Sequence, residues 1–101
     1  MVVYFKKGVK INGVQPEIAM AFPVIAATYH AQGYDCIITS CCDGEHSDNS
    51  FHYVGLAIDV RTRIVPTEDQ PALRDALASN LGDEFDVVLE SDHMHIEFDP
   101  E

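Results

Sequence analysis

The chain has 101 residues, of which 47% are hydrophobic and 23% are charged, as is usual for one compact globular domain. Its 17 acidic residues outnumber 6 basic ones and give a formal net charge of −11. This balance argues against binding to nucleic acid or to an anionic membrane surface. We therefore expect a single domain over residues 1–101 without a nucleic-acid partner.

The beginning of the chain lacks the order of a secretory signal. Lys6 and Lys7 follow a very short apolar run, whereas a signal peptide places its positive residues first. No stretch approaches the ~20 apolar residues that cross a bilayer, so no membrane insertion is expected. We expect synthesis in the cytoplasm, and any target outside the cell would be reached by a separate release route. The sequence does not determine the oligomeric state.

The first predicted element is a helix from Gln15 to about Gln32. Pro16 suits the first turn of this helix, and Gly33 suits its end. One apolar face repeats at helical spacing. This face comprises Ile18, Ala21, Phe22, Ile25, Ala26 and Tyr29.

Two strands are predicted next, over residues 34–39 and 54–61, with a polar loop at residues 40–49 between them. The three cysteines are odd in number, and two are adjacent, so no disulfide framework is expected. Cys36 is predicted to be a structural residue of the first of these strands. The other two are Cys41 and Cys42, whose spacing is not typical of metal ligands.

A second helix is predicted to begin with a capping box formed by Thr67 and Gln70 and to end at Gly82. Its buried stripe comprises Leu73, Leu77 and Leu81. Two more strands, over residues 85–90 and 93–98, are joined by a tight corner at Ser91 and Asp92. The elements predict an α+β fold: a small, mainly antiparallel sheet with helices on one face and a functional site on the other.

Three residues far apart in the sequence form a candidate metal site: His52, Asp59 and His95. Two imidazoles and one carboxylate bind zinc and leave a fourth position open, which makes water a nucleophile near neutral pH. The set therefore suggests a hydrolase. The alternative is that these are ordinary exposed polar residues, since a His-x-His pair on a strand often binds no metal.

Strand periodicity favours the metal site. In residues 93–98, His93, His95 and Glu97 share one face, and the apolar residues between them share the other. In residues 56–61 the same alternation places Asp59 and Arg61 opposite the apolar side chains. Asp59 and the two histidines of the last strand meet on one face if these two strands are neighbours.

Two segments carry a family resemblance: DGEHSDNSFHYVGLAID (residues 43–59) and ESDHMHIE (residues 90–97). They resemble the D-Ala-D-Ala carboxypeptidase and L-alanyl-D-glutamate endopeptidase family of zinc peptidases, which shares its fold with the hedgehog signalling domain. The resemblance covers residues 37–98. The short chain is most similar to small phage or bacterial members, including endolysins.

The resemblance implies that His52, Asp59 and His95 hold Zn²⁺. It also implies an acidic general base three residues before the last ligand, which is Asp92 here. Glu90 is the rival, because the hedgehog branch places its acid further upstream. His93 would be a supporting residue or a donor to the transition state. His46 would stabilise the oxyanion.

One departure from the family affects specificity. Many members carry an arginine in the region of residues 40–50 that holds the substrate carboxylate, and this chain has none there. Arg61, Arg63 or an N-terminal lysine would have to replace it. The expected function is hydrolysis of peptidoglycan stem peptides, hence cell-wall degradation, by a carboxypeptidase or, somewhat preferred, an endopeptidase. The alternative is a non-catalytic zinc-containing module that binds a peptide or glycan. The acidic loop is also compatible with a calcium site.

Overall fold

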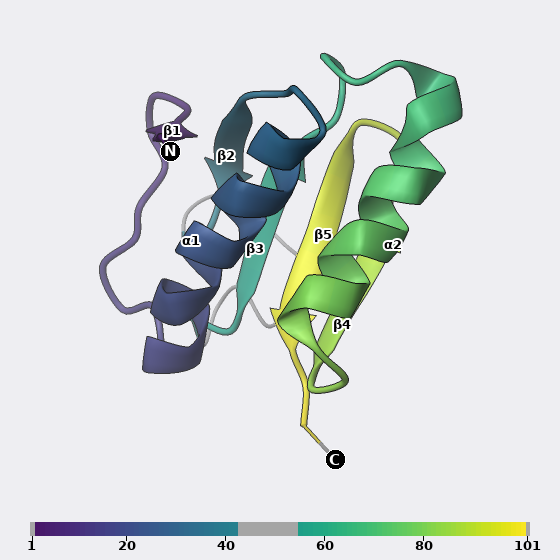
Figure 1. Cartoon of the computed structure of the whole chain (residues 1–101). Coiled ribbons are helices and arrows are strands. Elements are labelled where there is room, and N and C mark those ends of the chain that lie inside the picture. Colours follow the sequence, from purple (N-terminus) through teal and green to yellow (C-terminus); the bar gives the residue numbers. More distant parts are fainter. Residues whose placement is uncertain (1, 43–54, 101) are drawn as a thin grey trace.

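The computed structural model describes residues 2–42 and 55–100 of the chain (Figure 1). Its elements are, in order, β1 (Val3–Phe5), α1 (Pro16–Ala31), β2 (Cys36–Ser40), β3 (Ala57–Arg61), the 3₁₀-helix η2 (Thr67–Asp69), α2 (Gln70–Leu81), β4 (Phe85–Leu89) and β5 (His93–Phe98). The predicted helices and strands are present within two or three residues of their expected ends.

The five strands form one mixed sheet in the order β1-β2-β3-β5-β4. β1 and β2 are parallel, and the other three neighbouring pairs are antiparallel. Figure 1 shows α1 and α2 side by side on the same face of this sheet. The predicted α+β fold with a mainly antiparallel sheet and helices on one face is confirmed.

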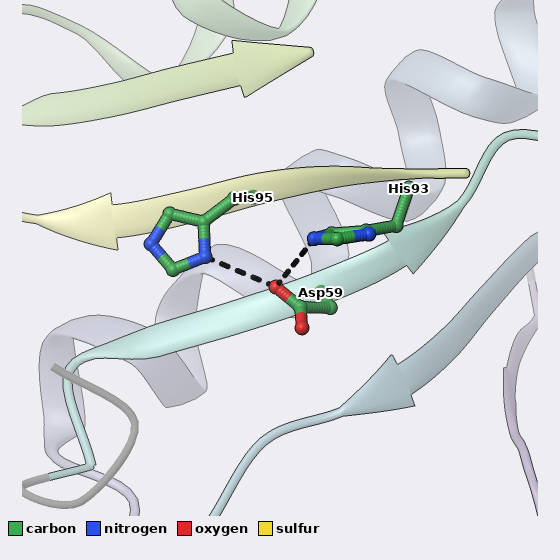
Figure 2. Close-up of side chains that lie close together, drawn as sticks. All are labelled: Asp59, His93 and His95. Atoms are coloured by element: carbon green, nitrogen blue, oxygen red, sulfur yellow. Dashed lines mark hydrogen bonds and ion pairs between the residues drawn. The ribbon is translucent and has the colours of Figure 1, made fainter. Parts of the chain in front are cut away.

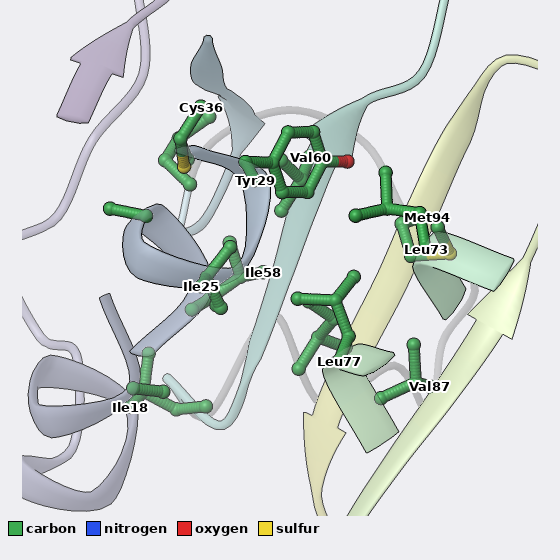
Figure 3. Packing of buried hydrophobic residues seen from close by; sticks show 14 of the residues in the cluster. Ile18, Ile25, Tyr29, Cys36, Ile58, Val60, Leu73, Leu77, Val87 and Met94 are labelled. Atoms are coloured by element: carbon green, nitrogen blue, oxygen red, sulfur yellow. The ribbon is translucent and has the colours of Figure 1, made fainter. Parts of the chain in front are cut away.

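The core lies between the two helices and the sheet (Figure 3). Ile18, Ile25 and Tyr29 of α1 are fully buried there, as is Leu77 of α2. The strand residues that meet them are Ile38, Ile58, Val60, Met94 and Ile96. Burial of each such side chain contributes roughly 1.5–3 kcal/mol, so this layer holds the sheet against the helices.

A hydrogen bond between a helix and the sheet anchors the strand that carries Asp59. The hydroxyl of Tyr29 in α1 donates to the backbone carbonyl of Arg61, at 3.0 Å, at the end of β3. Because Tyr29 is buried, this bond is shielded from water and fixes α1 relative to that end of β3.

The N-terminal strand β1 was not predicted from the sequence. It has three residues, is mostly exposed and pairs in parallel with β2 through the register Val3–Cys36. A parallel pair requires a crossover, which α1 provides here. The short segment lacks an alternating pattern of its own, so its conformation depends on this distant pairing.

The predicted capping box at the start of the second helix is wrong. No side-chain cap bond forms at the N-terminus of either η2 or α2. The amide of Gln70 instead donates to the carbonyls of Thr62 and Val65, at 3.2 and 3.0 Å. The Gln70 side chain thus fixes the loop that follows β3. Thr67 does not cap α2, because it begins the separate 3₁₀-helix η2.

β4 is an edge strand, and a side chain covers part of its free edge. The backbone N–H of Glu90 donates to His93, and the carbonyl of Glu84 accepts from Asp99, so even-numbered residues of this segment face β5. Val87 therefore points its carbonyl away from the sheet. The Nε of Arg74 in α2 donates to that carbonyl at 2.9 Å, which removes one acceptor from an edge open to further pairing.

Cys36, Cys41 and Cys42 form no disulfide bond in the structure, in line with the expectation that the chain has no disulfide framework. Cys36 is buried in β2, and burial raises the pKa of its thiol to about 12. The thiol is therefore neutral at physiological pH and acts as a small apolar core residue, as predicted. Among the described residues, no helix has the length and apolar character to cross a membrane.

Candidate metal centre

The pairing of β3 with β5 brings Asp59 and His95 together. The two strands are antiparallel neighbours, and Asp59 lies directly opposite His95 in their register. Arg61 lies opposite His93 and Ala57 opposite Glu97. Because opposed residues project to the same face, the adjacency that the sequence left open is the one that the metal site requires.

Asp59 lies between two histidines of β5 (Figure 2). Its Oδ1 is 3.0 Å from Nδ1 of His95 and 3.6 Å from Nε2 of His93. Asp59 is 9% exposed and both histidines are partly buried. Ile58, Val60, Met94 and Ile96, which alternate with these residues, are fully buried on the helix side of the sheet. The site therefore occupies the face away from the helices, as periodicity predicted.

The three side chains could hold a metal ion, since one ligand atom from each lies within 4.8 Å of the others. Zinc–ligand bonds of about 2.0–2.1 Å in a tetrahedral site place neighbouring ligand atoms about 3.3 Å apart. The observed separations of 3.0 and 3.6 Å lie on either side of that value. The donor set and its spacing thus fit a small divalent cation with little rearrangement.

The structure brings together two of the three predicted ligands and adds one. Asp59 and His95 meet as expected, and His93, predicted to be a supporting residue, completes a three-donor group. His52 and His46 lie outside the described residues. The signal for His93 was already in the sequence, because it shares the face of His95 two residues away.

The two candidate bases differ in their relation to this group. Oδ1 of Asp92 lies 2.6 Å from Nδ1 of His93, whose other nitrogen faces Asp59. The side chain of Asp92 is 81% exposed. Glu90 is also exposed, and its backbone N–H donates to the carbonyl of His93 at the corner before β5. Asp92 is therefore linked to the metal group through the ring of His93.

Glu97 is a member of the site that sequence reasoning placed on the correct face but gave no role. Its Oε1 lies 2.8 Å from Nε2 of His95, the ring nitrogen remote from Asp59. The side chain is 23% exposed. Carboxylates thus contact both ring nitrogens of His95. The sequence contained a sign of this role for Glu97, because Glu97 follows the candidate ligand His95 by two residues on the same strand face.

Arg61 is a cation on the same face as the metal group. The residue opposite it on β5 is His93, which is not acidic. No ion pair of its guanidinium is present among residues 2–42 and 55–100. An arginine in this position is available to an anionic ligand.

A second group of carboxylates lies beside the metal centre. Asp86, Glu97 and Asp99 have oxygens within 4.8 Å of one another. Asp86 is exposed, and exposed acidic groups commonly lack a bound ion. The acidic loop considered for calcium falls largely in residues 43–54, outside the described part of the chain.

Hydrogen bonding determines the charge of the site without metal. The hydrogen bond to Asp59 is the main cause of a raised pKa of His95, the bond to Glu97 adds to it, and burial opposes it. The hydrogen bond from His93 is the main cause of a lowered pKa of Asp92. A proton and a metal ion would therefore compete for Nδ1 of His95, and a rise in pH would favour the metal.

The raised pKa of His95 predicts a pH dependence of stability in the metal-free protein. A raised folded-state pKa stabilises the fold below about pH 6.5, and this contribution disappears as the pH rises through the folded value. We expect the free energy of unfolding of the wild type minus that of His95→Gln to decrease from pH ~6 to pH ~9. Urea denaturation of both chains in chelator measures this difference. A constant or increasing difference would contradict the assigned ion pairs.

The sequence matches no protein-family model, and a search of curated proteins finds no match.

Proposed function

We propose that this protein is a zinc-dependent metallopeptidase that hydrolyses peptide bonds in peptidoglycan stem peptides. The observation that carries the proposal is the opposition of Asp59 and His95 across β3 and β5, with His93 beside them. Two imidazoles and a carboxylate are a donor set typical of catalytic zinc, and here they lie on the sheet face away from the helices. Zinc bound by such a set supplies Lewis-acid activation of water and of the scissile carbonyl.

The resemblance to the D-Ala-D-Ala peptidase family supports both the metal and the substrate. The SxHxxxxxxD spacing that ends at Asp59 and the HxH that ends at His95 are its motifs. A mainly antiparallel sheet with helices on one face is compatible with the hedgehog-like fold of that family. Under this proposal His52 is the third zinc ligand, and His93 lies next to the substrate. His93 as a ligand in place of His52 is the alternative that the described residues support.

We propose that Asp92 contributes to proton transfer, as the resemblance implies, and that Glu90 is the rival. Asp92 Oδ1 lies 2.6 Å from Nδ1 of His93, which favours a route in which Asp92 orients the ring. In this route Nε2 of His93, rather than Asp92, accepts and returns the proton of the attacking water. A lowered pKa makes Asp92 itself a weak proton acceptor at neutral pH, which supports this route. His46 is proposed to stabilise the oxyanion, as in the resembling family.

Arg61 bears on which peptide bond is cleaved. It is a cation on the site face that could pair with a substrate carboxylate, and its position opposite His93 places it two residues along β3 from Asp59. A carboxypeptidase needs such a group for the free C-terminus, whereas an endopeptidase does not depend on it. Both specificities remain within the proposal, and the products distinguish them.

The test is digestion of purified cell wall with zinc-loaded protein. We expect new amino termini to be released, the release to stop with chelator and to return with added zinc. Free D-alanine among the products would identify a carboxypeptidase, and new amino termini within the stem peptide an endopeptidase. Metal analysis of the same sample should find about one zinc ion per chain.

The alternative is a zinc-containing binding module that recognises a peptide or glycan without cleaving it. The same family resemblance to the hedgehog signalling domain favours it. Zinc-loaded protein that sediments with cell wall but releases no new termini or amino acids would support the module and overturn the peptidase.

A further inference from the structure

The contacts of His95 differ at its two ring nitrogens, and the difference has a chemical consequence. Nδ1 lies 3.0 Å from Asp59 Oδ1, on the side of the three-donor group. Nε2 lies 2.8 Å from Glu97 Oε1, on the opposite side of the ring. A neutral imidazole carries its proton on only one of these nitrogens. The nitrogen that binds a metal must be the other one.

The two carboxylates therefore compete for the ring proton of neutral His95. A proton on Nδ1 satisfies Asp59 but blocks the nitrogen that faces the metal group. A proton on Nε2 satisfies Glu97 and leaves the Nδ1 lone pair for a cation. Histidines that bind metals generally donate their other N–H to a carboxylate or carbonyl, which fixes the ring and increases its basicity.

Glu97 is well placed for this function. It follows His95 by two residues on β5, so both side chains are on the same face of the sheet. Its residue opposite on β3 is Ala57, which is small, and its residue opposite on β4 is Asp86. With a side chain that is 23% exposed, the carboxylate is partly withdrawn from water, which strengthens the hydrogen bond.

We propose that Glu97 is a positioning residue of the metal centre, which holds the proton of His95 on Nε2 and thereby presents Nδ1 to the ion. The inference rests on the proposed metal-dependent function. It adds a residue outside the ligand set and outside the candidate acid–base pair.

The test compares Glu97→Ala and Glu97→Gln with the wild type and with Asp86→Ala as a matched control. Asp86 is an acidic residue directly opposite Glu97 on β4, so its removal changes the charge near the site without touching His95. Zinc affinity is measured by competition with a chromophoric chelator. We expect Glu97→Ala to bind zinc about 10–100-fold more weakly. Glu97→Gln should be intermediate, because its amide oxygen accepts the same hydrogen bond without charge, and the control should change by about twofold at most.

A second measurement needs no metal. Long-range ¹H–¹⁵N spectra of metal-free protein, at a pH where His95 is neutral, report which nitrogen carries the proton. We expect the Nε2–H form to dominate in the wild type and Glu97→Ala to shift the population toward Nδ1–H. A loss of fold alone would not produce this shift.

The outcomes separate the two proposals. Unchanged zinc affinity and an unchanged tautomer in Glu97→Ala would overturn the role of Glu97 while leaving the metal centre intact. A wild type that binds no zinc would overturn the proposed function, whereas the tautomer shift would still test the contact between Glu97 and His95. An equal loss of affinity in Asp86→Ala would show a general charge effect and also contradict the proposal.

Discussion

Asp59→Asn is expected to weaken zinc binding strongly while leaving the fold intact. Asp59 Oδ1 is the atom shared by both histidine contacts, at 3.0 and 3.6 Å, so its charge is central to the donor group. Asparagine preserves the shape but removes the anionic oxygen that offsets the charge of the cation. We expect affinity to fall on the order of 1,000-fold, which corresponds to about 4 kcal/mol. Chelator competition measures the affinity, and circular dichroism checks the fold.

Asp86→Asn is the control for this substitution. It makes the same chemical change on an exposed strand residue that belongs to the neighbouring acidic group. We expect it to bind zinc like the wild type. Retention of zinc by Asp59→Asn together with its loss in Asp86→Asn would move the ion to the acidic group and contradict the candidate site.

Asp92→Ala is expected to retain zinc and lose turnover. Asp92 lies outside the three-donor group and contacts it through His93, at 2.6 Å. Removing a residue of the proton-transfer path lowers rates about 10²–10⁴-fold. Release of new termini from cell wall measures turnover, and metal analysis of the same preparation measures zinc content. Normal turnover would show that the assignment is wrong.

Two further variants separate the possible roles of the acidic residues. Asp92→Asn keeps an oxygen that accepts from His93 Nδ1, so it should retain more activity than Asp92→Ala if Asp92 orients the histidine. If Asp92 is itself the base, both variants should lose activity equally. Glu90→Ala should be near wild type in either case, and a large loss there would identify Glu90 as the base.

Periodicity was sufficient to predict the elements that build the site. The alternation in residues 93–98 correctly divided the strand into Met94 and Ile96 in the core and His93, His95 and Glu97 on the other face. The helical repeat likewise predicted most of the buried face of α1, although Phe22 is only partly buried and the buried Thr28 was not predicted. Such patterns arise from burial within one helix or strand, so they can be recognised in a single sequence.

Features that depend on distant contacts were not predicted. The strand β1 forms because β2 pairs with it, and its three residues contain no sign of this. Gln70 bonds to the loop after β3 rather than forming a capping box, because Thr67 already lies in a separate 3₁₀ turn. The adjacency of β3 and β5 had to be assumed, since nothing in either strand names its neighbour. The 2.8 Å contact of Glu97 with His95 required side-chain positions.

The one-to-one opposition of Asp59 and His95 also makes the site a reporter of correct assembly. If the register between β3 and β5 shifted by one residue, Ile58 or Val60 would lie opposite His95, and the Asp59 carboxylate would face the hydrophobic core. A chain with the wrong register, or without the β3–β5 pairing, would therefore lack the proposed metal-binding site. If zinc binds this site as proposed, titrating zinc into refolding protein would count the molecules in which β3 and β5 pair in the native register, independently of any catalytic assay.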